Sequence, residues 1–147
     1  MKTRKFLSIT LAFLATTITL LGCEKETAIN PDKLPKEILN YISTHFPDNP
    51  IKKAVVDKEW FKKTYEIMLY GNIELEFNRN KEIVDIEAES KLPDSVIPDL
   101  ILQYVIENYP DNYIIKWELE YKSQEIKLNN GLELVFDMDG NFLRIDD

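Results

Sequence analysis

The chain is poor in the residue types from which most enzyme and metal sites are built. Its 147 residues include one cysteine, Cys23, and one histidine, His45. No two thiols are therefore available for an internal disulfide, and no second soft ligand can share a metal ion with His45. The four glycines are never spaced as GxGxxG, and no serine lies in a nucleophile-elbow context. The sequence thus predicts a protein that is not an enzyme and that has no metal site and no cofactor.

Positive charge is also scarce. The chain has 18 Lys and Arg against 26 Asp and Glu, a net charge of −8. Residues 1–22 carry three positive charges and no acids, so the net charge of the remaining chain is −11. This balance repels nucleic acid and anionic lipid surfaces, favours solubility and leaves room for a basic partner. We therefore expect no nucleic-acid binding.

The first 22 residues have the pattern of an export signal. A positive segment is followed by the uncharged residues 6–21, and the run ends in Leu20-Leu21-Gly22-Cys23. This ending resembles the bacterial lipoprotein signal. The resemblance implies cleavage before Cys23, a lipid on its thiol, and anchoring in the cell envelope, on the periplasmic side or at the outer-membrane surface. An ordinary secretory signal with an incidental cysteine is the alternative.

Residues 23–32 are polar and predict a short tether between the anchor and the fold. The acids that follow Cys23 resemble the surface-export signal of some Bacteroidetes lipoproteins. A plain solvated linker is the alternative interpretation of the same residues.

The rest of the chain contains an internal duplication. Residues 34–49 align without a gap with residues 97–112, and residues 66–89 align with residues 125–147. The offset is 63 positions in the first block and 59 in the second, so the four-residue difference lies between the blocks. The duplication predicts two structural repeats, at 33–90 and 91–147.

Each repeat predicts one helix followed by four strands. Apolar residues recur at helical spacing in 34–46 and 97–109, and Pro47 and Pro110 end these helices. The period then changes to two, as in Ile73-Glu74-Leu75-Glu76-Phe77. The other expected strands lie near 51–58, 65–70, 83–89, 114–121, 125–128, 132–136 and 142–147. We expect an α+β fold in which the tandem antiparallel repeats form one curved sheet with both helices on one face.

These motifs resemble the PepSY-like family of Bacteroidetes envelope proteins. The resemblance rests on the helix that opens with Leu34-Pro35, its Phe46-Pro47 ending, the Glu-Ile-x-Leu strand, and Phe136-Asp137-x-x-Gly140 before the last strand. The first copy departs from the pattern at residues 78–81. That family is similar in fold to the beta-lactamase inhibitory protein. The resemblance implies this fold and an inhibitor or binding role, and it transfers no functional residue.

The candidate binding residues are aromatic or apolar side chains among the exposed acids. Trp60 and Phe61 lie in the four-residue excess of the first copy, at a charged hairpin tip. By alternation Met68, Tyr70 and Val135 point to the helix-free side. Together these residues predict a binding face with aromatic anchors. The alternative is that Trp60 and Phe61 fold back over a sheet edge.

Three further patterns favour structural roles. Glu74, Glu76, Glu125 and Glu133 predict a solvated face, with no flanking pattern that suggests a raised pKa. Residues 137–141 superficially resemble the start of a calcium loop, but the twelfth position lies beyond Asp147, so a turn with Gly140 at positive φ is expected. Trp117, Leu119 and Tyr121 share a face and predict core positions.

Two functional hypotheses follow. The first is an envelope-anchored, non-catalytic module that binds a protein or peptide through the open sheet face, in the manner of an inhibitor. The second is a structural or accessory lipoprotein, or a sensor of a small ligand or cation that exploits the strong acidity.

Overall fold

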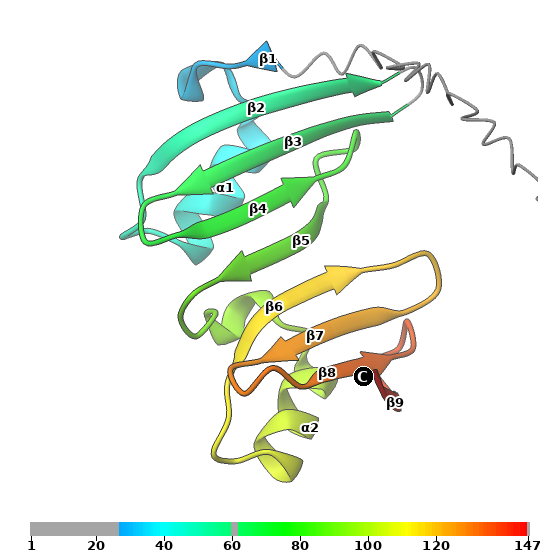
Figure 1. The fold of residues 1–147 in the computed structure, drawn as a ribbon. Helices are drawn as coiled ribbons and strands as arrows, with labels where there is room; N and C mark the ends of the chain where they lie inside the picture. Colours follow the sequence, from blue (N-terminus) through cyan, green and yellow to red (C-terminus); the bar gives the residue numbers. More distant parts are fainter. Residues whose placement is uncertain (1–26, 60–61, 147) are drawn as a thin grey trace, which may run out of the picture.

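The computed structural model describes residues 27–59 and 62–146, which form one antiparallel sheet with two helices packed on it (Figure 1). The nine strands of the described residues follow one another across the sheet in chain order, and every neighbouring pair is antiparallel. The strands are β1 (Thr27–Ala28), β2 (Ile51–Glu59), β3 (Lys62–Leu69), β4 (Ile73–Phe77), β5 (Ile83–Ala88), β6 (Ile114–Leu119), β7 (Gln124–Leu128), β8 (Glu133–Phe136) and β9 (Phe142–Asp146).

The helices α1 (Lys36–His45) and α2 (Asp99–Asn108) begin directly after a proline and end just before one. Each is preceded by a short 3₁₀ helix, η1 (Pro31–Lys33) or η2 (Asp94–Val96). Both helices lie behind the sheet in Figure 1, and no helix of the described residues covers the opposite face. The predicted α+β fold, with its tandem repeats and both helices on one side, is confirmed.

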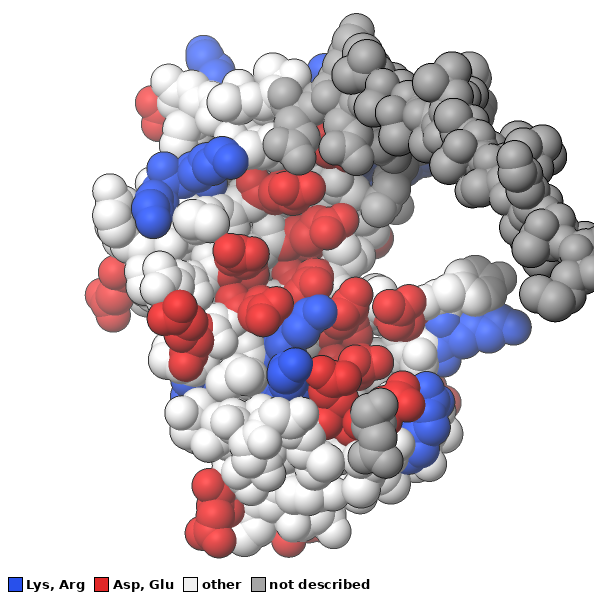
Figure 2. All heavy atoms as spheres, in the orientation of Figure 1, with Lys and Arg blue, Asp and Glu red and all other residues white. Residues whose placement is uncertain are grey.

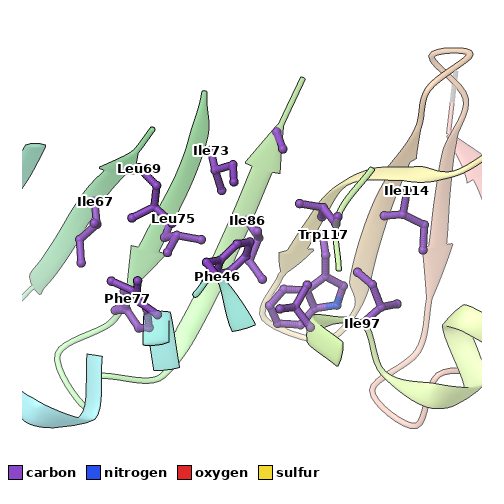
Figure 3. Close-up of a cluster of buried hydrophobic side chains, with 14 of the residues drawn as sticks. Phe46, Ile67, Leu69, Ile73, Leu75, Phe77, Ile86, Ile97, Ile114 and Trp117 are labelled. Atoms are coloured by element: carbon purple, nitrogen blue, oxygen red, sulfur yellow. The ribbon is translucent and has the colours of Figure 1, made fainter. Parts of the chain in front are cut away.

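The core lies between the helices and the sheet. Alternate residues of each strand point to the helices, as Ile73, Leu75 and Phe77 do in β4, whose burial alternates along the strand. Figure 3 shows these side chains on the side of the sheet where Phe46, at the end of α1, lies beside Leu75 and Ile86. Because most hydrophobic side chains converge on one side of the sheet, the other side carries most of the charged residues of the strands.

The two repeats reproduce each other in detail. The Tyr41 ring of α1 packs edge-on against Phe77, with 5.4 Å between the ring centroids. Tyr104 of α2 packs edge-on against Phe136 with the same distance between centroids. The register shifts immediately before Phe77 and again immediately before Phe136, so both repeats have a β-bulge in the same place. The duplicated sequence therefore encodes a duplicated packing.

The repeats are joined by the pairing of β5 with β6. In this seam Asp85 lies opposite Glu118, Ile86 opposite Trp117, and Glu87 opposite Lys116. Ile86 is fully buried opposite Trp117, whose indole N–H donates to Gln124 Oε1 at 3.1 Å. The His45 ring adds a second link, because its Nδ1 lies 2.9 Å from Ser95 Oγ in η2. A single core thus runs through both repeats.

Two elements differ from the sequence-based expectations. The end of the predicted tether forms β1, whose Thr27 and Ala28 pair with Val56 and Val55 of β2. Tyr121 is 90% exposed and not in the core, because β6 ends at Leu119 and the chain turns there. Within the described part of the chain, neither helix is long and apolar enough to cross a membrane.

Candidate functional site

The helix-free face carries a row of carboxylates that crosses the seam between the repeats. Strand register places five acids directly opposite one another on five consecutive strands. These residues, which we call the acidic row, are Glu66, Glu76, Asp85, Glu118 and Glu125. Like charges directly opposite each other destabilise a sheet, so the fold sustains this arrangement against its electrostatic cost.

A neighbouring row on the same face places two lysines, Lys116 and Lys127, beside the acidic row. Lys116 Nζ lies 2.6 Å from Glu118 Oε2 and 3.5 Å from Asp85 Oδ2. Lys127 Nζ lies 2.8 Å from Glu133 Oε1. Figure 2 shows the result as a band of acidic side chains across the middle of the face, with two basic groups beside it. The band keeps an excess of negative charge.

Asp85 is a strongly perturbed carboxylate of the acidic row. Burial raises the pKa of Asp85 to about 6, with Glu118 and Glu87 adding to the rise and Lys116 opposing it. Burial by itself lowers the pKa of Lys116, but its hydrogen bond to Glu118 and the nearby carboxylates outweigh that effect and raise it. The lysine therefore stays charged, while Asp85 takes up a proton just below neutral pH.

Glu125 is perturbed in the same direction. Burial raises the pKa of the Glu125 carboxyl, and Glu133 and Glu118 raise it further. The expectation that no carboxylate of this face has a raised pKa is therefore wrong. Flanking residues in the sequence give no warning of this, because the neighbouring charges come from other strands.

Two depressions open on the helix-free face, and Glu76 and Asp85 line both. The first, of about 200 Å³, lies over β2–β5 and is bordered by Met68 and Val55. The second, of about 670 Å³, lies beside the β4–β5 turn and reaches Glu118 on β6. The face is thus hollowed on both sides of its most acidic point, with an apolar border on one side.

The predicted binding residues differ in how much surface they expose on the helix-free face. Met68 lies half-buried at the border of the first depression, and Tyr70 is exposed in the turn after β3. Val135 lies opposite Glu125, on the predicted face, but is only 1% exposed and offers little surface. Trp60 and Phe61 lie outside the described residues, as does Cys23, so their roles stay predictions.

Three residues of the acidic row were missed by the sequence reasoning: Glu66, Asp85 and Glu118. The alternation in β3 and β5 places the first two on the polar face. What the sequence lacked was the pairing of β5 with β6, which brings Asp85 opposite Glu118. The expected solvated face is thus part of a continuous acidic surface.

The described residues offer little to a metal ion. No group of three or more His, Cys, Asp and Glu residues within residues 27–59 and 62–146 has the geometry to hold one. The Asp137 carboxylate is engaged by its own turn, accepting from Asp139 N at 3.0 Å and from Asn141 N at 2.8 Å. The Asn141 side chain, whose Nδ2 donates to Asp137 Oδ2 at 2.9 Å, and these backbone bonds lower the pKa of Asp137. Gly140 has φ +90°, as expected for a turn.

Comparison with solved structures identifies related Bacteroides proteins that are described as periplasmic. A Bacteroides vulgatus protein, described as a "putative periplasmic protein", is 35% identical over 86% of this chain and all of its own, with a TM-score of 0.80. A second protein of that species is 32% identical, over 83% of this chain and 99% of its own, with a TM-score of 0.77. A Bacteroides thetaiotaomicron protein, described as a "putative calcium-regulated periplasmic protein", is 29% identical over 83% of this chain and 97% of its own, with a TM-score of 0.79.

No curated protein matches the chain significantly. The family profile described as "Putative beta-lactamase-inhibitor-like, PepSY-like" matches twice, over residues 21–85 and 63–144. The two matches overlap at residues 63–85 and together cover the described fold from η1 to β9. The chain therefore belongs to the PepSY-like family of beta-lactamase-inhibitor-like proteins.

Proposed function

We propose that this protein is an envelope lipoprotein that binds a basic protein or peptide segment on its helix-free sheet face and performs no catalysis. The observation that carries the proposal is the acidic row, which concentrates five opposed carboxylates where no helix covers the sheet. A partner with Lys or Arg at this surface would relieve repulsion that already exists in the free protein. Family membership is consistent with an inhibitor-like role.

Two features suit the face to a peptide and not to a small ion. The depressions on either side of Glu76 and Asp85 give room for side chains, and Met68 adds apolar contact. Exposed carboxylates attract a basic partner over about 10 Å at moderate salt, which chiefly raises the association rate. We therefore expect binding that weakens steeply with ionic strength.

The envelope anchor is part of the proposal. Cys23 precedes β1 by four residues, a stretch that spans at most about 14 Å. A lipid on Cys23 would hold the β1 edge of the sheet within that distance of the membrane surface. The helix-free face would then stay accessible at the side of the molecule.

The test is a titration of the protein with a short oligo-arginine peptide, followed by calorimetry at low and high salt. The variant Glu76→Gln/Glu118→Gln/Glu125→Gln removes three charges from the acidic row, and we expect it to lower the affinity about tenfold or more. The matched control is Glu37→Gln/Asp48→Asn/Asp111→Asn, which removes three exposed charges on and beside the helices.

We expect the control to change the affinity by less than about twofold, because its sites are distant from the face. Equal losses in the two variants would show that net charge alone attracts the peptide, and would contradict a defined site. Tyr70→Ala and Trp60→Ala examine the aromatic part of the predicted face. Unchanged affinity in both would remove those side chains from the site.

The second candidate, a cation sensor, is favoured by the description of the Bacteroides thetaiotaomicron relative. It predicts a saturable calorimetric response to calcium that the acidic-row variant loses. A flat response to calcium together with peptide binding would leave only the first function.

A further inference from the structure

The last strand, β9, has the same place in the second repeat that β5 has in the first. The alignment of residues 66–89 with 125–147 puts Asp85, Ile86 and Glu87 at the positions of Arg144, Ile145 and Asp146. The register agrees, since Ile86 lies opposite Leu75 and Ile145 opposite the equivalent Leu134. What differs is the other edge of each strand.

The edge of β5 that faces away from β4 pairs with another strand, whereas the equivalent edge of β9 has no partner among the described strands. β5 pairs with β6, whereas β9 ends the sheet and pairs only with β8 among the described strands (Figure 1). As a result Ile86 is fully buried, but its equivalent Ile145 is 45% exposed. Leu143, the neighbouring apolar side chain of β9, is exposed as well. An uncovered edge with apolar side chains is a surface that pairs with another strand.

The opposite edge of the sheet cannot serve as the partner of β9 in the way that β6 serves β5. There β1 pairs with Val55 and Val56, and Ile29 N donates to Ala54 O at 3.0 Å. The middle of the β2 edge is thus already occupied. The outermost described strand at that edge, β1, has only two residues, so a symmetric pairing of two β9 edges gives the longer ladder.

The charges of β9 are arranged for such symmetry. Arg144 and Asp146 lie on either side of Ile145, and their side chains form an exposed ion pair at 3.0 Å. In an antiparallel pair centred on Ile145, each Arg144 comes opposite the Asp146 of the other strand, and the two Ile145 side chains face each other. Opposite charges and apolar side chains in direct cross-strand positions stabilise a sheet.

We propose that β9 pairs with the β9 of a second copy of this chain, antiparallel and centred on Ile145. The two sheets then continue into one. Directly opposed residues of an antiparallel pair point to the same side, so both sets of helices lie on one side and both acidic rows on the other. This dimer would offer two equivalent binding faces on one continuous surface. The inference does not depend on the binding of a basic partner.

The contact between strands of five residues is smaller than a standard protein interface, so we expect a dimer with a dissociation constant of about 10–1000 µM. Sedimentation equilibrium over protein concentrations up to about 1 mM measures it. The sample is the chain after the signal, with Cys23→Ser to exclude a disulfide-linked dimer. We expect Ile145→Lys to raise the dissociation constant at least about tenfold.

The control is Ile106→Lys, which places the same substitution at an isoleucine that is 59% exposed on α2. It should leave the dissociation constant within about twofold of the parent. Arg144→Asp and Asp146→Arg each set like charges opposite one another and should weaken the dimer, whereas the double variant restores the opposed pairs and the affinity. This restoration identifies the register.

A chain that stays monomeric throughout the concentration range would overturn the proposal. So would a dimer that Ile106→Lys weakens as much as Ile145→Lys, or a double charge exchange that fails to recover the affinity. Thermal unfolding of each variant shows that the comparison is made between folded proteins.

Discussion

Replacement of Asp85 by asparagine is expected to stabilise the protein at neutral pH. The Asp85 side chain is only 26% exposed and lies between Glu76 and Glu118 in the acidic row. Burial, reinforced by Glu118 and Glu87 against the opposing effect of Lys116, raises its pKa from 3.8 to about 6. Asparagine has nearly the same shape but carries no charge. The substitution therefore removes the buried charge with little change in packing.

That Asp85→Asn should stabilise the protein, and not destabilise it, follows from the numbers of protons bound by the folded and unfolded states. In the unfolded chain Asp85 ionises near pH 4, but in the folded protein it ionises only near pH 6. The folded state binds more protons between these values, so its stability falls as the pH rises from 4 through 6, and the loss is complete above about pH 7. Asparagine does not titrate, so the variant lacks this loss.

The size of the effect has an upper limit of about 3 kcal/mol, which corresponds to the difference between the two pKa values. Because part of the side chain reaches water and Lys116 Nζ lies 3.5 Å away, we expect about 1–2 kcal/mol. Urea unfolding of the parent and Asp85→Asn, each at pH 4 and pH 7.5, measures the free energies of unfolding. At pH 4 the two proteins should differ by less than about 0.5 kcal/mol.

Glu37→Gln is the control, because it removes one negative charge on α1, away from the acidic row. Its effect should be small and alike at both pH values. If Asp85→Asn proved equally or more destabilising at pH 7.5 than at pH 4, the ion pair with Lys116 would dominate over burial. The account of an electrostatically strained row would then be refuted.

Three further predictions concern the core, a turn and the anchor. Ile86→Ala should lower the free energy of unfolding by about 2–4 kcal/mol, whereas Ile145→Ala, at the equivalent exposed position, should lower it by less than about 1 kcal/mol. Urea unfolding measures both values, and similar losses would contradict the packing of the seam. Gly140→Ala, at φ +90° and with a new methyl 3.1 Å from a leucine of α2, should lower the melting temperature more than Gly131→Ala, at φ +88° with open space around it. Cys23→Ser should move the protein from the membrane to the soluble fraction on cell fractionation, and continued membrane association would refute lipidation at that residue.

Most of the fold could be predicted from the sequence because the pattern of each helix and strand occurs in both repeats. The stripe on α1 recurs on α2, and alternation in β4 recurs in β8, so each element has an independent second instance. β1 escaped prediction because two residues carry no periodicity, and its pairing with β2 is a long-range contact. Tyr121 was misplaced because alternation continues past Leu119 in the sequence after the strand itself has ended.

The candidate site was less predictable. Alternation alone assigns Glu76 and Glu125 to the helix-free face, but it does not say how far apart they lie. The distance depends on the seam, where Asp85 and Glu118 bring the acids of both repeats into one row. The exposed edge of β9 is hidden from the sequence for the same reason, since Ile145 and Ile86 occupy equivalent positions and differ only in what lies beyond them.

The central claim is that the helix-free face, and not the rest of this acidic surface, receives a basic partner. Amide chemical-shift mapping by NMR during titration with an oligo-arginine peptide tests it most directly. We predict that the perturbed amides cluster in β4–β7, around Asp85 and Glu118, and that the acidic-row variant loses them. Perturbations that centre on α1 and α2, or that spread evenly over all exposed acids, would contradict the claim.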